Sequence, residues 1–293
     1  RAQERGHNSQ EVFMTRRVFV LVIVAIIAVA GLAFGSGEQE QEGGVVAQPE
    51  VDAGGQAPML AEMVEAGEIP PLEDRMPENP YVVEPWDEIG SYGGTLRRAY
   101  TGAGDGLGFS KLGNPGLVGF TPSGTQIEPW LAESFDVSDD GLVYTFYLRE
   151  GVRWSDGEPF TTEDIMFDWN DEVLNEEISP SVSSIYKVGG QVMEVEAVDE
   201  YTIRYTLPGV SAVFLQNMAQ HGVGAATVVP AHYVEQFHAD YADADELEAL
   251  VDEGDYDSWV QLYQARTDFT QNPELPSLRP WLLEDRLGSD TVN

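Results

Sequence analysis

Residues 131–170 read LAESFDVSDDGLVYTFYLREGVRWSDGEPFTTEDIMFDWN, and this stretch decides the fold. It opens with two short runs of strand-forming residues, Phe135–Val137 and Leu142–Leu148, on either side of Asp139-Asp140-Gly141. Aspartate followed by glycine is typical of a tight turn, because both residues tolerate the backbone angles that the turn requires. The stretch therefore predicts a β-hairpin.

Side chains alternate along the second strand of this hairpin. Tyr144, Phe146 and Leu148 share one face, and Val143, Thr145 and Tyr147 share the other. Since neither face carries a charge, we expect both faces to be covered by other parts of the protein.

A helix is predicted after the turn-rich segment Gly151–Pro159. Thr161 and Asp164, three residues apart, approximate a capping box, which places a negative charge at the positive end of the helix. The expected buried stripe of this helix consists of Ile165, Trp169 and Val173, which recur every four residues.

The same patterns predict further elements on both sides of this stretch. A second hairpin is expected at Val192–Val198 and Tyr201–Leu207, around Asp199-Glu200. Helices are expected at Ala57–Ala66, Val210–Met218 and Pro230–Tyr241, the last with Pro230 in its first turn, and an acidic helix-and-loop segment at Asp243–Trp259. Ile69–Pro85, which carries five prolines, is expected to be extended along the surface.

The folded domain is expected to begin near Gly93, with a first strand at Thr95–Thr101. The glycine-rich loop Gly102–Gly108 that follows lacks the spacing and the lysine of a phosphate-binding loop. It is either a plain turn or a stretch of backbone that lines a cleft, and the sequence leaves both interpretations open.

The N-terminal residues have the features of an export signal. Met14 precedes Arg16 and Arg17 and an apolar run from Val18 to Phe34, and small residues follow it. We interpret residues 1–13 as an over-extended reading frame, 14–37 as a signal peptide and 38–92 as a linker and surface-wrapping leader. Ser36 stands where a lipobox would carry its cysteine, so we expect a periplasmic or secreted protein without a lipid, the alternative being an uncleaved signal anchor.

The net charge is strongly negative. The chain has 51 Asp and Glu against 15 Lys and Arg, a formal charge of −36. Such a charge repels nucleic acid and anionic lipid. It fits either a cationic ligand or a surface adapted to high salt, and we favour high salt because the acids are spread over the whole chain.

Few residues could bind a metal or a cofactor. The chain has no cysteine and only four histidines. His232 and His238 could meet only if the backbone between them is not a regular helix. We therefore predict no metal site and no cofactor.

The segments described so far resemble the family 5 extracellular solute-binding proteins, the oligopeptide- and dipeptide-binding proteins of ABC importers and their relatives. The residues that carry the resemblance are Leu131, Glu133, Asp140, Gly141, Trp154, Asp156, Gly157, Pro159, Phe160, Thr161 and Asp164. Further resemblance lies in Leu72–Arg98, Val195–Leu207 and Val229–Tyr241.

The resemblance implies an α/β fold of the type II periplasmic-binding-protein class, with two lobes. Residues 93–293 would then hold mostly the first lobe and its extra subdomain, without the second lobe. The implied function is capture of a peptide or an oligosaccharide in the cleft between the lobes, and delivery to the permease of an ABC importer. A monomer with no enzymatic activity is expected, which meets the membrane only through the permease or an uncleaved signal anchor.

The resemblance identifies the fold better than the ligand, because the matching residues have mainly structural roles. For ligand contact we predict the end of the first strand and its loop, Tyr100, Thr101, Gly102, Ala103 and Gly104. Trp130 or Trp86 could stack on a sugar ring, although packing is the other use of both side chains.

Two other classes of protein remain as alternatives. A carboxylate-dependent hydrolase would need two carboxylates at a fixed separation, and the chain has no Gly-x-Ser-x-Gly or His-Glu-x-x-His motif. A calcium-stabilised surface protein could use Asp240, Asp243, Asp245 and Glu246, which lack the spacing of a helix-loop-helix calcium site.

Overall fold

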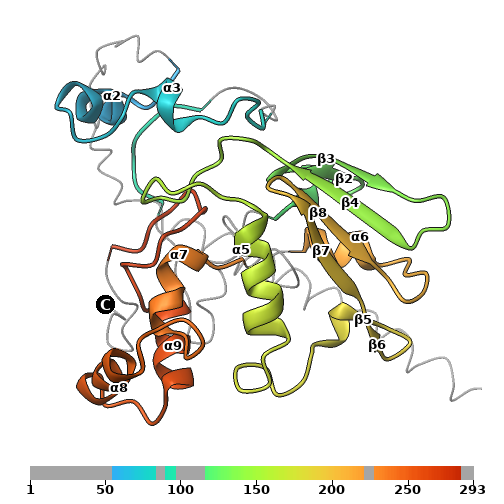
Figure 1. Ribbon diagram of the computed structural model, residues 1–293. Helices are drawn as coiled ribbons and strands as arrows, with labels where there is room; N and C mark the ends of the chain where they lie inside the picture. The colour runs from blue at the N-terminus through green and yellow to red at the C-terminus, as the bar shows by residue number, and fades with distance from the viewer. Residues whose placement is uncertain (1–54, 84–89, 97–115, 221–227, 285–293) are drawn as a thin grey trace, which may run out of the picture. The chain divides into compact units, whose positions relative to one another are not determined.

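A four-stranded antiparallel sheet is the centre of the computed structural model, which describes residues 55–83, 90–96, 116–220 and 228–284. The strands are β3 (Ala132–Val137), β4 (Val143–Leu148), β7 (Glu194–Asp199) and β8 (Thr202–Thr206). Their spatial order is β3-β4-β8-β7 (Figure 1). Both hairpins expected from the sequence are therefore confirmed, and the first begins earlier, at Ala132.

The two hairpins join along β4 and β8. Tyr144 lies opposite Tyr205 and Phe146 opposite Ile203. All four side chains are buried, because they point to the face of the sheet that packs against helices.

The expectation that both faces of β4 are covered is wrong. Tyr147 on the second face is 39% exposed, and Val143 and Thr145 are half-buried. An uncharged strand face does not require cover when the neighbouring strands present polar groups. Here Asp136 accepts a hydrogen bond from the Tyr147 hydroxyl, and Arg204 pairs with Glu196 at 2.7 Å.

The predicted capping box is confirmed at the start of α5 (Thr162–Phe167). The Thr161 hydroxyl accepts from the Glu163 N–H, and Asp164 accepts from the Thr161 N–H. The helix continues as a π-helix, Asp168–Val173. Ile165 and Trp169 are buried as predicted, while Val173 is half-buried.

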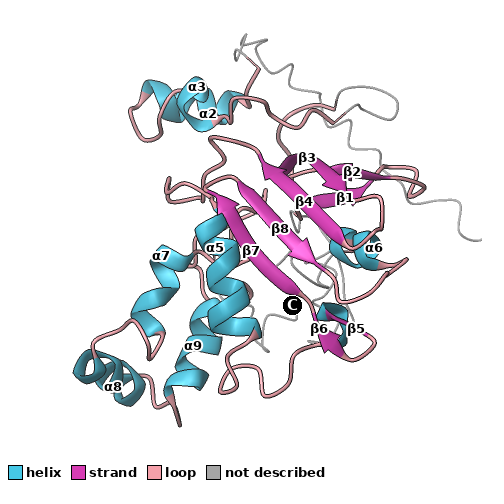
Figure 2. Ribbon diagram, turned by 45° about the vertical axis from the view of Figure 1, so that its right-hand side comes forward, coloured by secondary structure: helices cyan, strands magenta, loops and turns pink. Residues whose placement is uncertain are grey.

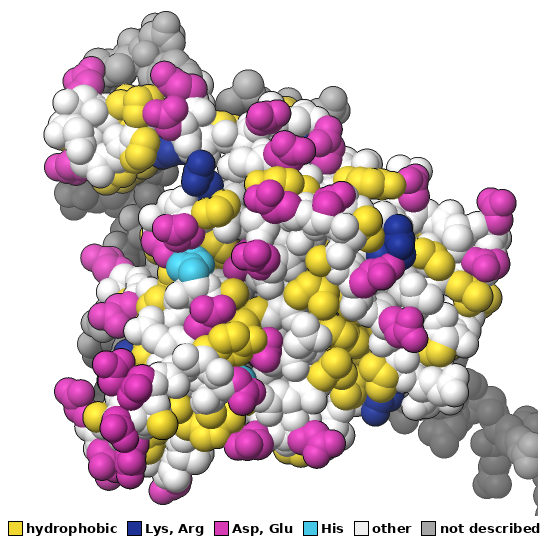
Figure 3. Space-filling view, in the orientation of Figure 1, with side chains coloured by type: hydrophobic (Ala, Val, Ile, Leu, Met, Phe, Trp, Pro, Cys, Tyr) yellow, Lys and Arg dark blue, Asp and Glu magenta, His cyan; other side chains and the backbone are white. Residues whose placement is uncertain are grey.

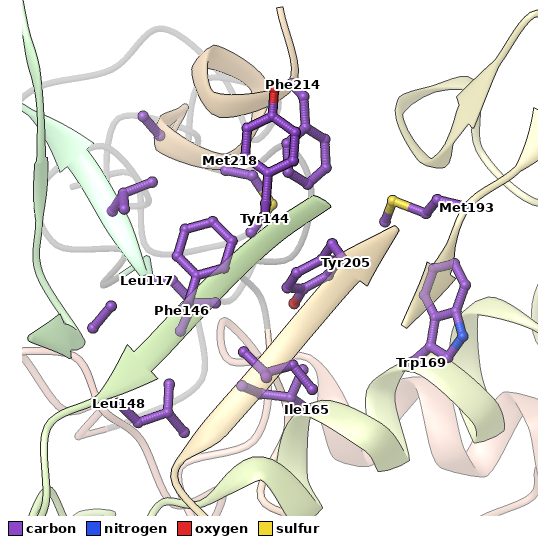
Figure 4. Packing of buried hydrophobic residues seen from close by; sticks show 14 of the residues in the cluster. Leu117, Tyr144, Phe146, Leu148, Ile165, Trp169, Met193, Tyr205, Phe214 and Met218 are labelled. Atoms are coloured by element: carbon purple, nitrogen blue, oxygen red, sulfur yellow. The ribbon is translucent and has the colours of Figure 1, made fainter. Parts of the chain in front are cut away.

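Helix α5 contributes to two hydrophobic clusters. Ile165 packs with the side chains of the sheet, as Figure 4 shows, and Phe167 belongs to a second cluster with residues of the C-terminal helices. Figure 2 shows α5 running beside β7. The π-helix that follows has Trp169 in the first cluster, and its Glu172 accepts a hydrogen bond from Tyr263 of the second.

The helices after the sheet are shorter than predicted. Helix α6 is Phe214–Ala219, so the start expected at Val210 is wrong. Helix α7 is Ala231–Val234, with Pro230 as its N-cap instead of in its first turn, and a 3₁₀ turn, Glu235–Phe237, ends it. Because the chain leaves the helix there, His238 points into the second cluster instead of continuing a helix face.

The remaining elements are short. Helix α8 (Ala244–Glu253) confirms the predicted acidic helix, and α9 (Trp259–Thr267) was not predicted. Helix α2 (Pro58–Glu65) was predicted, whereas the turn α3 (Leu72–Arg75) interrupts a segment expected to be extended. The described residues also form a 3₁₀ turn, Ser184–Tyr186, and two small ladders: β1 (Val118–Phe120) with β2 (Ile127–Pro129), and β5 (Lys187–Val188) with β6 (Gln191–Val192).

Candidate functional site

Asp164 is a buried residue that connects several of the residues that carry the family resemblance. Its side chain accepts hydrogen bonds from the Thr161 N–H at 3.1 Å, the Ala231 N–H at 3.0 Å and Trp154 Nε1 at 3.3 Å. Burial raises the pKa of this carboxyl, and the three donors together with His232 oppose that rise. One carboxylate thus ties α5, the preceding loop and the start of α7 together.

The loop before α5 is fixed by its own residues. Trp154 and Phe160 are buried and meet edge-on, with ring centroids 5.9 Å apart. Gly157 has φ +100°, a backbone angle that other residues rarely adopt, and Pro159 forms a β-bridge with Arg153.

The same loop contacts α7 through a histidine. Oδ2 of Asp156 lies 2.8 Å from Nε2 of His232, and the rings of His232 and Trp154 meet edge-on, with centroids 6.4 Å apart. The loop therefore contacts the first turn of α7 through His232.

The hairpin turn between β3 and β4 is stabilised by hydrogen bonds among its own residues. Asp140 accepts from the Ser138 hydroxyl at 2.6 Å and from the Leu142 N–H at 3.1 Å, and these bonds lower the pKa of its carboxyl. Gly141 has φ +70°. The sequence motif at this turn is explained by backbone geometry.

Leu131 and Glu133 lie where the leader meets the sheet. Leu131 packs against the main cluster, and Glu133 accepts from Nδ2 of Asn79 at 2.7 Å. The buried Arg149 donates to the backbone carbonyls of Trp130 and Asn79. Arg149 thus clamps the leader residues to the end of β4.

Trp130 is largely committed to packing. A Cβ added to Gly119 would lie 2.0 Å from its indole, so the ring rests directly on that glycine. The ring of Tyr81 lies next to the indole, tilted by 40°, with centroids 6.4 Å apart. Ligand contact by Trp130 stays a prediction, and the predicted contacts at 100–104, together with Trp86, lie outside the described residues.

An open groove of about 430 Å³ lies at one end of the sheet. It is lined by Glu133, Tyr147, Leu148, Glu150, Asp199, Glu200, Tyr201 and Thr202. A hydrogen bond to Asp136 raises the pKa of Tyr147, and burial together with Glu200 raises that of Tyr201, so both phenols remain protonated donors. We call this feature the acidic groove; its chemistry suits hydroxyl groups and cations.

Carboxylates are not confined to this groove. Figure 3 shows Asp and Glu side chains over the whole visible face, with few Lys and Arg among them. The acidic groove is therefore distinguished by its shape more than by its charge.

A contact between a buried and a half-buried carboxyl group, those of Asp168 and Glu172, was not predicted from the sequence. Asp168 and Glu172, one turn apart on the π-helix, hydrogen-bond each other, and Glu172 accepts from the Tyr263 hydroxyl at 2.6 Å. Burial, then the charge of Glu172, raises the pKa of Asp168 well above its ordinary value. Helical spacing alone could have brought the two acids together, but nothing in the sequence indicates their burial.

The model of the bacterial extracellular solute-binding proteins, family 5, matches residues 126–272. These residues contain the sheet, the capping box and the start of α7. The chain belongs to this family. It accordingly has the α/β fold of type II periplasmic-binding proteins and spans only part of that fold.

The proteins similar to this chain bind different ligands. A periplasmic α-galactoside-binding protein of Rhizobium meliloti is 31% identical over 199 residues, which are 61% of this chain and 28% of that protein. Di/tripeptide-binding protein 1 of Pseudomonas aeruginosa is 34% identical over 117 residues, 35% of this chain and 22% of that protein. This chain thus spans about a quarter of the curated relatives that it matches.

Among solved structures, an oligopeptide-binding protein OppA has a TM-score of 0.71 at 42% identity. The match covers 77% of the present chain and 35% of OppA. The periplasmic binding protein MelB of Agrobacterium fabrum, in complex with stachyose, has a TM-score of 0.52 at 23% identity, over 78% and 35% of the two chains. The second likeness supports the fold alone. Within the described part of the chain, no helix has the length and apolar character needed to cross a bilayer.

Proposed function

We propose that the protein is the extracytoplasmic solute-binding component of an ABC importer, which captures a peptide and delivers it to the permease. The observation that carries this proposal is the continuous match of the sheet and its capped helix to family 5, together with the likeness to OppA at 42% identity. The expected mechanism is closure of two lobes over a ligand, followed by docking of the closed form to the permease.

An oligosaccharide is the second candidate ligand. It is favoured by the α-galactoside-binding protein, whose similarity covers 61% of this chain. Hydroxyl groups of a sugar would find acceptors and donors in carboxylates and phenols such as those of the acidic groove.

The finer parts of the proposal come from the sequence. We propose export through the signal peptide at 14–37, a leader at 38–92 and a solute-binding domain from 93 onwards, acting as a monomer without enzymatic activity in the periplasm or outside the cell. The negative surface is proposed to be an adaptation to high salt. Ligand contact is assigned to Tyr100, Thr101, Gly102, Ala103 and Gly104.

A thermal-shift titration of the full-length protein tests the proposal. Short peptides should raise the melting temperature in a saturable way, because a ligand that binds only the folded state stabilises it by RT ln(1 + [L]/Kd). Thr101→Ala should weaken that response, and Thr125→Ala, in the exposed turn between β1 and β2, should not.

The same titration with α-galactosides decides between the two ligand classes. If neither class produces a saturable shift, the proposed function is wrong. Cleavage of a peptide or glycan that disappears on substitution of one carboxylate would indicate the hydrolase instead.

A further inference from the structure

Asp171, His238 and Asp240 bring three metal-binding groups together beside the second hydrophobic cluster. One ligand atom from each side chain lies within 4.8 Å of the other two. Asp171 comes from the π-helix and the other two residues from the turn after α7, so 67 positions separate Asp171 from His238. Among the described residues, no other group of His, Cys, Asp and Glu meets this criterion.

His238 is held in one orientation. It is 0% exposed, and its ring is surrounded by Phe167, Tyr241, Trp259 and Tyr263, with centroids 4.9–5.8 Å away. A buried imidazole that cannot rotate needs little ordering when it binds an ion.

The hydrogen bonds of His238 assign its tautomer. The backbone N–H of Asp240 can only donate, and it lies 3.2 Å from Nδ1, so Nδ1 carries the lone pair. Nε2 then carries the proton and donates to the Asp171 carbonyl oxygen at 3.3 Å, whereas Nδ2 of Asn175, also 3.3 Å away, is a donor and makes no hydrogen bond with Nε2 in this tautomer. Metal-binding histidines commonly donate their second ring N–H to a backbone carbonyl in this way.

The Asp240 carboxylate lies on the side of that lone pair, and an oxygen of the Asp171 carboxylate lies within 4.8 Å of the ligand atoms of both other residues. Oδ2 of Asp240 is 3.9 Å from Nδ1, and its side chain is 75% exposed, so it can move towards an ion. The Tyr241 hydroxyl donates to Asp171 at 2.9 Å and fixes its orientation.

We propose that Asp171, His238 and Asp240 bind a divalent transition-metal ion such as Zn²⁺. Bonds of 2.0–2.2 Å place the ligand atoms of one ion about 3–4 Å apart, which a small movement of Asp240 achieves. When the ion binds, Nδ1 would lose its hydrogen bond from the Asp240 N–H and coordinate the ion instead. One imidazole with two carboxylates suits Zn²⁺, Mn²⁺ or Co²⁺, whereas Ca²⁺ prefers oxygen ligands alone.

The site is independent of the proposed transport function, and its test needs no transported ligand. Chelator competition on the full chain in 1 M NaCl should find one Zn²⁺ bound tightly per chain, since salt weakens binding to the acidic surface in general. Asp240→Asn should weaken this binding by more than about tenfold, and Tyr241→Phe by about tenfold.

Two variants serve as controls. Asp245→Asn removes the same charge from an exposed position five residues away, and His232→Gln removes the rival His–Asp pair. Both should leave the tight site unchanged. Co²⁺ should in addition quench the fluorescence of Trp259, whose ring centroid lies 4.9 Å from that of His238, and Trp259→Phe should remove that part of the quenching.

Other outcomes overturn the proposal. It is wrong if Asp240→Asn binds Zn²⁺ as tightly as the unaltered chain, if His232→Gln abolishes the tight site, or if no binding at one ion per chain is found. Ca²⁺ that binds at least as tightly as Zn²⁺ would also contradict the assigned chemistry.

Discussion

Single residues with several buried contacts should dominate the response to mutation. Asp164 is 4% exposed and accepts from three donors that belong to different segments. Asn at this position keeps only one acceptor oxygen. We expect Asp164→Asn to lower the free energy of unfolding by about 1.5–3 kcal/mol, measured by urea denaturation.

The matched control for Asp164 is Asp139→Asn, the same change at an exposed turn position. It should stay within about 0.5 kcal/mol of the unaltered chain. Equal effects of the two substitutions would show that the network does not stabilise the fold.

The carboxyl pair on the π-helix should make stability depend on pH. Because the pKa of Asp168 is raised on folding, the folded state favours its protonated form. The stability that this proton contributes is complete below the pKa of the unfolded carboxyl, about 3.9, and is lost as the pH rises through the raised value in the folded state. Asp168→Asn mimics the protonated group and should remove this loss.

Urea denaturation of both proteins between pH 4 and pH 8 checks this expectation. Asp168→Asn should gain stability over the unaltered chain as the pH rises, and the exposed Glu163→Gln should not. Parallel pH profiles for Asp168→Asn and the unaltered chain would contradict the role of the pair.

At the scale of elements, the hairpin of β1 and β2 depends on the close approach of Trp130 to Gly119. Gly119→Ala should cost about 1–3 kcal/mol, because the new methyl group would displace the indole. The cost should nearly vanish in the Trp130→Ala background, since no ring is then displaced. Urea denaturation of the four proteins measures this coupling, and additive effects would contradict it.

The leader segment is held to the sheet by the clamp of Arg149. Arg149→Met removes its hydrogen bonds to the Trp130 and Asn79 carbonyls and should speed amide hydrogen exchange at Glu78, whose N–H donates to the Glu150 carbonyl. Arg204→Met, which removes a surface ion pair, is the control and should leave that exchange unchanged. Unchanged exchange in Arg149→Met would show that Arg149 does not hold the leader.

The sequence predicted those features of the helices and strands that depend on residues close together in the chain. The capping box at Thr161 and the turn at Gly141 depend on residues two to four positions apart, and both appear as predicted. The exposed face around Tyr147 depends on which segments pack there, which no strand pattern contains. The burial of His238 likewise follows from the early end of α7.

The same limit explains the candidate sites. Asp171 and His238 are brought together by the π-helix and the turn after α7; the sequence predicted a helix through Val173 but not its π form, and it did not predict the turn. Helix α9 was not predicted, although Trp259, Leu262 and Tyr263 have the i, i+3, i+4 spacing of one helical face, and Leu262 and Tyr263 are buried. These contacts depend on packing between segments far apart in the chain, which local sequence patterns do not specify.

At the scale of the whole molecule, the charge of −36 should make stability depend on salt. Raising NaCl from 0.1 to 1 M shortens the screening length from about 10 Å to about 3 Å and weakens repulsion between carboxylates. The urea midpoint should therefore rise with salt. A midpoint that stays constant or falls would contradict an adaptation to high salt.

The junction of β4 with β8 also has a kinetic consequence. Each hairpin closes a short loop, whereas the pairing of Phe146 with Ile203 must bring together residues more than fifty positions apart. Closing that larger loop costs entropy before its contacts form. Refolding should thus be limited by the meeting of two preformed hairpins, and shortening the connection between them should speed refolding without touching the core.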